Sequence, residues 1–145
     1  MKLIPVDPEF GEKLYRPILT VRIPAGFPSP ADDYLEERID LNDYIVSHRS
    51  ATFYYWVEGN SMEEAGIFDR DLIVVDNSLK PENNDIVQAV IDGEMTLKQI
   101  KIFDDKIFLY PKNVNYKPLE ITETMNFLVR GVVICNIHFH KRIHK

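Results

Sequence analysis

The sequence contains a single cysteine, Cys135, among its 145 residues. One thiol cannot form a disulfide within the chain, which agrees with a reducing compartment. Cys135 lies in the apolar run from Phe127 to Ile137. Because a free cysteine usually behaves as a small apolar group, we expect Cys135 to belong to the hydrophobic core.

Long apolar runs are also missing from the sequence. No stretch approaches the roughly 20 apolar residues that a membrane-spanning helix needs. The amino-terminal residues include Asp7, Glu9, Glu12 and Lys13, and they lack the apolar centre of a signal peptide. We therefore expect a cytoplasmic protein with no membrane partner.

Positive charge is scarce, since 17 lysines and arginines face 23 acidic residues and the net charge is −6. Binding to the phosphate backbone of DNA needs a concentrated basic surface, so we expect no direct sequence-specific DNA binding. The basic tail does contain His138 and His140, whose spacing would place both side chains on one strand face. No nearby cysteine or carboxylate completes a set of three or four metal ligands. We therefore expect a solvated strand end there, and no metal or other cofactor.

The remaining composition is typical of one globular domain with a single core. A chain of 145 residues with 45% hydrophobic content lies within the common domain size of about 100 to 150 residues. Asp40 is placed to cap a short helix that includes Leu41, Tyr44 and Ile45. Residues 1 to 25 show no sustained period. Beyond the helix, six segments rich in β-branched and aromatic residues predict a mainly β fold: Thr52 to Val57, Leu72 to Val75, Ile86 to Ile91, Met95 to Phe103, Lys106 to Tyr110 and Phe127 to Ile137.

A serine and a lysine stand out as a catalytic pair. Ser61 lies in the turn-forming stretch Gly59 to Met62, directly after an aromatic strand, and Lys98 lies within a later apolar strand. A serine hydroxyl needs an adjacent base to become a nucleophile, and a lysine can act as that base only when it is neutral. Burial favours the neutral form of a lysine. The pattern predicts Ser61 as nucleophile and Lys98 as general base, with the backbone N–H groups of Asn60 and Ser61 as oxyanion donors.

The surroundings of Lys98 can be predicted from a turn. Asp92-Gly93 lies between two alternating runs and is a strong signal for a two-residue hairpin. In that register Lys98 lies opposite Val87, and Thr96 lies opposite Ala89. The lysine then shares a strand face with small or apolar groups, which would hold its charge poorly. A lysine on a solvated strand face is the alternative.

A proline-rich segment near the amino terminus is the candidate substrate. Residues 23 to 30 place three prolines around the Ala25-Gly26 step. Proline fixes its own φ and pushes the preceding residue toward extended geometry. We expect an exposed, extended segment whose small residues suit a protease site, with Ala25-Gly26 as the bond that is cut. A plain flexible linker is the alternative.

Two pairs of carboxylates flank the turns around the serine. They are Glu63 with Glu64, and Asp69 with Asp71. Paired carboxylates can serve as a general acid and a general base. Beside turns they are more often solvated, and we expect a solvated rim here.

Several ordered blocks cover nearly the whole chain from Gly26 onward: Gly26 to Ala31, Arg38 to Asn42, Gly59 to Met62, Gly66 to Leu72, Asp85 to Val87 and Asp92 to Lys98. In these blocks the sequence resembles the LexA/UmuD family of self-cleaving Ser-Lys (S24-type) peptidases. Family members often have aspartate where this chain has Asn60 and glycine where it has Arg70, and a residue without the freedom of glycine can alter that turn.

The resemblance implies a fold and a biological setting. The fold would be a LexA-like catalytic domain of twisted antiparallel sheets with one or two short helices. Self-cleavage would divide the chain into an extended arm, residues 1–25, and a Ser-Lys catalytic and dimerisation domain, residues 26–145. In such proteins RecA filaments on single-stranded DNA stimulate cleavage during the SOS response to DNA damage. The product is a homodimer that joins a UmuC-like polymerase in error-prone translesion synthesis.

Other functions are compatible with parts of the pattern. The chain could be a non-catalytic polymerase accessory or dimerisation module in which Ser61 and Lys98 are incidental. It could be a LexA-like self-cleaving regulator with other partners, although the arm is too short for the helix-turn-helix of a repressor. A signal-peptidase-like enzyme would use the same chemistry but would need a membrane anchor.

Overall fold

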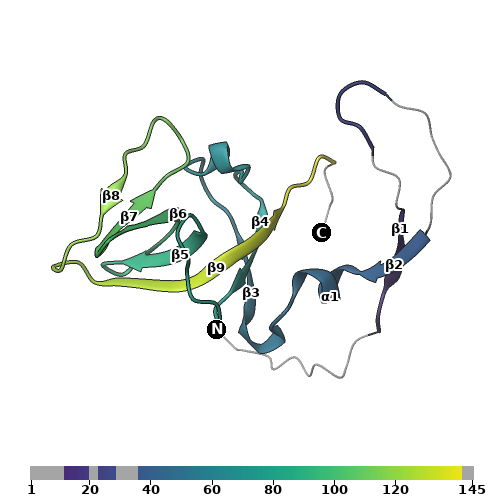
Figure 1. Cartoon of the computed structure of the whole chain (residues 1–145), viewed down its shortest axis with the longest axis horizontal. Helices are drawn as coiled ribbons and strands as arrows, with labels where there is room; N and C mark the ends of the chain where they lie inside the picture. Colours follow the sequence, from purple (N-terminus) through teal and green to yellow (C-terminus); the bar gives the residue numbers. More distant parts are fainter. Residues whose placement is uncertain (1–11, 20–22, 29–35, 142–145) are drawn as a thin grey trace. The chain divides into compact units, whose positions relative to one another are not determined.

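The computed structural model describes residues 12–19, 23–28 and 36–141. The chain divides into two compact units, residues Met1–Arg49 and Ser50–Lys145, and each is described separately (Figure 1). The predicted boundary at Ala25-Gly26 is a cleavage site and not a boundary between compact units, so this division does not test it.

The first unit contains a two-stranded antiparallel ribbon and one short helix. Asp40 caps the helix as predicted, because its Oδ1 accepts a hydrogen bond from the Asp43 N–H at 3.0 Å. Its Oδ2 accepts another from the Leu14 N–H at 2.7 Å. The bond from Asp43 and then that from Leu14 lower the pKa of the Asp40 carboxyl. The ribbon was not predicted, and its elements are β1 (Tyr15–Leu19), β2 (Glu36–Asp40) and, after them, α1 (Leu41–Ile45).

The second unit is one antiparallel sheet with the strand order β3-β4-β9-β5-β6-β7-β8. All six predicted strands are present and differ from the prediction by one residue at most. Only the short strand β8 was missed in this unit. The strands are β3 (Thr52–Trp56), β4 (Leu72–Asp76), β5 (Ile86–Ile91), β6 (Glu94–Phe103), β7 (Lys106–Tyr110), β8 (Leu119–Glu120) and β9 (Phe127–Ile137), with single turns of 3₁₀ helix at Arg49–Ala51 and Glu63–Ala65. The mainly β fold is confirmed.

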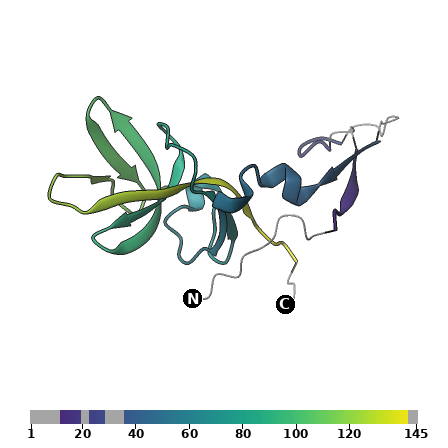
Figure 2. The ribbon, with the colours of Figure 1, turned by 90° about the horizontal axis from the view of Figure 1, so that it is seen from below.

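Strand β9 joins the two halves of this sheet and runs lengthwise through the unit (Figure 2). Its register shifts once against β4, between Val74 and Val75, and once against β5, between Gln88 and Ala89. Such β-bulges bend a strand and increase its twist. The bends divide the sheet around two clusters of buried residues.

Each cluster forms a core on one side of this division, so the expectation of a single core is wrong. The first packs the end of β3 and the following turn against β4, and the second lies beneath β5, β6, β7 and β9. Both belong to the second unit. Their buried members are Val57, Met62, Ile67, Ile73 and Val75 in the first, and Val87, Ala89, Ile100, Leu109 and Val132 in the second.

Two further sequence predictions concern burial and membranes. Cys135 is partly buried rather than fully in the core, and burial raises the pKa of its thiol. Among the residues that the structure describes, no helix has the length and apolar character needed to cross a membrane.

Candidate active site

Ser61 lies in a turn that directly follows strand β3. The turn begins at Gly59, whose φ of +94° is a conformation that residues with a Cβ rarely adopt. The Gly59 N–H donates to Asp69 Oδ1 at 2.8 Å. On the other side of Ser61, the buried Met62 is 3% exposed and anchors the turn in the first core. The serine is thus held between a fixed glycine and a buried methionine.

A distant loop holds the same turn from the opposite side. Lys112 donates its backbone N–H to the Ser61 carbonyl at 2.8 Å. Asn113 donates its side-chain Nδ2 to the Asn60 carbonyl at 2.8 Å, and Tyr116 donates its hydroxyl to Asn60 Oδ1 at 2.8 Å. Sequence reasoning missed these residues. The only signal was a polar loop between Pro111 and Pro118, which does not say what it contacts.

Lys98 has the strand register that the Asp92-Gly93 turn predicted. Lys98 pairs with Val87, and Thr96 pairs with Ala89. Val87 and Ala89 are fully buried, so the lysine stem lies on an apolar strand face. The Lys98 Nζ donates to Thr96 Oγ1 at 2.6 Å and to the Leu97 carbonyl at 3.0 Å.

The charge of Lys98 is poorly stabilised. Burial lowers the pKa of its amine below the ordinary value of 10.5. Within the described residues no carboxylate forms an ion pair with it. These are the conditions under which a lysine loses its proton most easily, and they agree with the environment that the sequence predicted.

The serine and the neighbours of Lys98 line one cavity of about 350 Å³. Ser61 lies in its wall together with Thr96 and Leu97, the two residues to which the Lys98 amine is bonded. In the described part of the chain no hydrogen bond joins Ser61 Oγ directly to Lys98 Nζ. The full lining comprises residues 55–59, Ser61, Met62, Ile73, Gln88 and residues 95–97.

The walls of this cavity include two segments with free strand edges. Within the part of the chain that the structure describes, strand β3 is the first strand of its sheet and pairs only with β4. Strand β6 pairs with β7 only from Gln99 onward, so its Met95 to Lys98 edge on that side has no partner strand among the described residues. Free strand edges can take up an extended peptide through backbone hydrogen bonds. The wall of the cavity thus contains two strand edges whose backbone groups on that side have no partner strand among the described residues.

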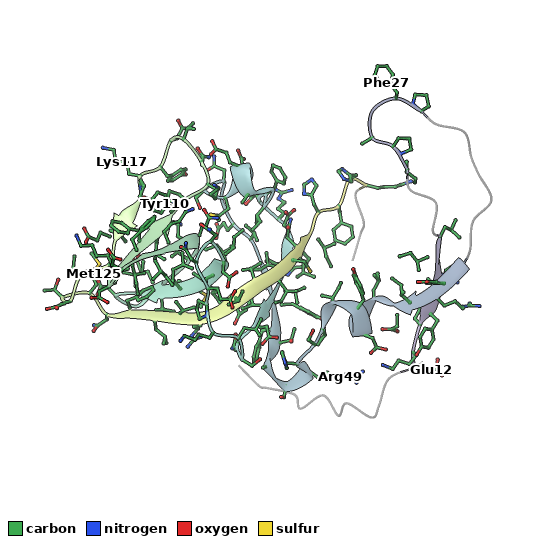
Figure 3. The ribbon with its side chains drawn as sticks, in the orientation of Figure 1. Glu12, Phe27, Arg49, Tyr110, Lys117 and Met125 are labelled. Atoms are coloured by element: carbon green, nitrogen blue, oxygen red, sulfur yellow. The ribbon has the colours of Figure 1, made fainter. Side chains whose placement is uncertain are left out.

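The predicted substrate bond, Ala25-Gly26, belongs to the first unit. Residues 23 to 28 are exposed throughout, as expected, and Phe27 lies at the outer end of its loop (Figure 3). The backbone bends over residues 25–27 instead of running straight through the prolines. Gly26 has no heavy atom near the position that a Cβ would take. The bond is thus accessible on its own unit.

The predicted solvated rim of carboxylates is wrong for Asp71. This residue is 2% exposed, and its Oδ2 accepts hydrogen bonds from the Phe68 N–H at 2.9 Å and from Asn136 Nδ2 at 2.8 Å. His138 Nδ1 lies 2.5 Å from Asp71 Oδ1, so this histidine is not simply a solvated strand end. Burial alone would raise the pKa of Asp71, but the bonds from Phe68, His138 and Asn136 outweigh it and lower that pKa. Through its bond to the Phe68 N–H, Asp71 stabilises the turn that contains Asp69, whose side chain binds the Gly59 N–H.

Known proteins resemble this chain over most of its length. The Peptidase S24-like family model matches residues 17–134. Protein SamA of Salmonella typhimurium is 46% identical over 122 residues, which cover 84% of each chain. Protein ImpA of Escherichia coli is 43% identical over 121 residues, covering 76% of this chain and 83% of its own.

A more distant relative has a different length. The LexA repressor of Stenotrophomonas maltophilia is 34% identical over 131 residues, which cover 87% of this chain but only 59% of the repressor. The family match and the identities to SamA and ImpA extend over most of the chain. This chain therefore belongs to the Peptidase S24-like family.

Proposed function

We propose that the chain is a serine endopeptidase that cleaves its own Ala25-Gly26 bond with Ser61 as nucleophile and Lys98 as general base. The observation that carries this proposal is the position of Lys98. Its amine has a lowered pKa, lacks a carboxylate partner among the described residues, and bonds to two wall residues of the cavity that Ser61 also lines.

In the first step, Ser61 Oγ attacks the carbonyl carbon of Ala25 and its proton passes to the neutral Lys98 amine. The tetrahedral intermediate carries an oxyanion that needs hydrogen-bond donors. The N–H groups of Asn60 and Ser61 are suited to this role, because neither bonds to another acceptor within the described part of the chain. Lys98 then returns the proton to the Gly26 nitrogen, which leaves as an amine.

The second step releases the arm from the serine. Water attacks the ester between Ser61 and Ala25, and Lys98 again accepts a proton and returns it to Ser61 Oγ. The products are residues 1–25 and residues 26–145. Because the cut bond lies between β1 and β2, the larger product keeps β2 and α1 and loses β1.

The segment around Ala25-Gly26 would enter the cavity as an extended peptide between the free edges of β3 and β6. Small residues at the bond suit a site in which Ser61 must approach the carbonyl closely. The bend at residues 25–27 would have to straighten on entry. The segment could come from the same chain or from a second copy.

For the biological setting we propose SOS mutagenesis, on the strength of the family and its LexA relative. The partners implied are a RecA filament on single-stranded DNA as activator, a second copy of the chain in a homodimer, and a UmuC-like translesion polymerase. The protein would act in the cytoplasm.

Mass spectrometry of the purified protein tests the proposal. We expect a product that begins at Gly26, whose formation rises as the pH increases through the Lys98 pKa. Ser61→Ala and Lys98→Ala should each abolish it while circular dichroism shows an unchanged fold. Product formation in either variant would contradict the assignment, as would its absence in the native chain with RecA filaments added.

A further inference from the structure

The peptide plane between Asn60 and Ser61 is fixed from one side only. Its carbonyl, on Asn60, accepts a hydrogen bond from Asn113 Nδ2 at 2.8 Å, whereas the Glu63 N–H approaches the same oxygen at a weaker 3.4 Å. Its N–H, on Ser61, has no acceptor among the described residues. Asn113 therefore provides the strongest contact that determines how this plane is turned.

The geometry of the peptide bond makes that contact matter to the reaction. A peptide unit is planar, and in a trans unit the carbonyl and the N–H point in opposite directions. No peptide bond in the described chain is cis. The hydrogen bond from Asn113 holds the Asn60 carbonyl toward Asn113. The Ser61 N–H in the same plane must then point away from Asn113, because it cannot rotate independently of the carbonyl.

We propose that Asn113 is a positioning residue that orients the Ser61 N–H as an oxyanion donor. This inference rests on the proposed peptidase function and identifies a residue that neither the sequence pattern nor the dyad indicated. Asn113 acts through the peptide plane and does not itself contact the reacting atoms.

The side chain of Asn113 is built for this single orientation. It is 8% exposed, and its Oδ1 accepts a hydrogen bond from the Asn115 N–H at 2.9 Å. Since only the oxygen can accept that bond, the Nδ2 must face the Asn60 carbonyl. The neighbouring Lys112 N–H holds the next plane through the Ser61 carbonyl at 2.8 Å. Two successive planes at the nucleophile are thus fixed by one loop.

The two bonds of Asn113 can be separated by one substitution. Asn113→Ser keeps a hydroxyl oxygen that can accept from the Asn115 N–H, but the side chain is too short to donate to the Asn60 carbonyl, and it adds no charge. We expect an unchanged fold and a self-cleavage rate about 10 to 100 times lower, less than the loss when an oxyanion donor is deleted outright. Because Lys98 is untouched, the rate should fall by the same factor at every pH and its pH midpoint should stay in place.

Matched variants complete the test. Val114→Ala changes an 86% exposed side chain in the same loop and should cleave at the native rate. If Asn113→Ser does not fold, Asn113→Thr serves instead, because its hydroxyl can also accept from the Asn115 N–H and is likewise too short to reach the Asn60 carbonyl. Cleavage by the folded variant within about twofold of the native rate, or a shifted pH midpoint, would overturn the role of Asn113. Absence of cleavage in the native chain would instead refute the peptidase function itself.

Discussion

A carboxylate placed beside Lys98 should switch the base off at neutral pH. Thr96 is the position for it, because its Oγ1 already accepts a hydrogen bond from the Lys98 amine at 2.6 Å on the same strand face. Thr96→Asp replaces a neutral acceptor with a negative one at nearly the same place. An opposite charge at this distance favours the ammonium form, so the pKa of Lys98 should rise.

The size of the effect follows from the distance. Two unit charges about 4 Å apart attract by about 4 kcal/mol at an effective dielectric constant of about 20, which corresponds to about 3 pKa units. Lys98 is only half-buried, and water screens part of this attraction. We therefore expect a rise of about 1 to 2 units, which lowers the neutral fraction of the lysine, and the cleavage rate near pH 7, by about 10 to 100 times.

The assay is the rate of self-cleavage from neutral to strongly alkaline pH. Thr96→Asp should shift the rising limb of the profile to higher pH and reach the native rate once Lys98 is deprotonated. Thr96→Asn is the matched control, since its amide has a similar size and keeps an acceptor without the charge. A profile that stays in place in Thr96→Asp, or moves toward lower pH, would refute Lys98 as the base.

Three predictions concern stability. Arg70 adopts φ +71°, a conformation that arginine tolerates poorly, so Arg70→Gly should raise the free energy of unfolding by up to about 1 kcal/mol in urea titrations. Asn84→Gly, at φ +77°, should raise it by less, because asparagine tolerates this conformation. A larger increase at Asn84 than at Arg70 would contradict backbone strain at Arg70. Asp71→Asn should cost about 1 to 3 kcal/mol at neutral pH. Because the folded-state pKa of Asp71 lies below 3.8, this cost should shrink as pH falls through that lower pKa, and a cost that grows toward acid pH would show the wrong sign. In Gly131→Ala the new Cβ would lie 2.6 Å from Val75 Cγ1. Relieving this clash should cost about 1 to 3 kcal/mol of stability and lower the thermal midpoint. An unchanged midpoint would mean that the neighbouring strands move apart at no cost.

The parts of the site that could be predicted from the sequence depend on local chemistry. Asp92-Gly93 determines the pairing of β5 with β6, and the structure shows Asp92 and Gly93 at the positive φ values that this turn requires. The side that Lys98 faces follows from the turn by alternation alone. Asp40 was recognisable as a cap because a capping side chain contacts the next turn of its own helix.

The parts that were missed depend on contacts between distant residues. Asn113 holds the Asn60 carbonyl across 53 positions in the sequence, and nothing in either segment specifies that meeting. Strand β1 was missed because its partner β2 lies beyond the proline-rich segment and its five exposed residues follow no burial period. Asp71 was misjudged because its burial depends on strand β9, far along the chain.

Asn60, the departure next to the nucleophile, lies where the structure tolerates it. The turn at the nucleophile is held through backbone groups, since Asp69 binds the Gly59 N–H, Asn113 binds the Asn60 carbonyl and Lys112 binds the Ser61 carbonyl. The side chain of Asn60 contributes one acceptor to the Tyr116 hydroxyl, and an aspartate would accept that bond equally well. The identity of the residue before the serine is therefore free to vary between these two, whereas the side chains of Asp69 and Asn113 hold the turn through their own polar atoms and are not interchangeable with apolar residues. This is why loss of the Asn113 amide, rather than a change at Asn60, should slow the reaction.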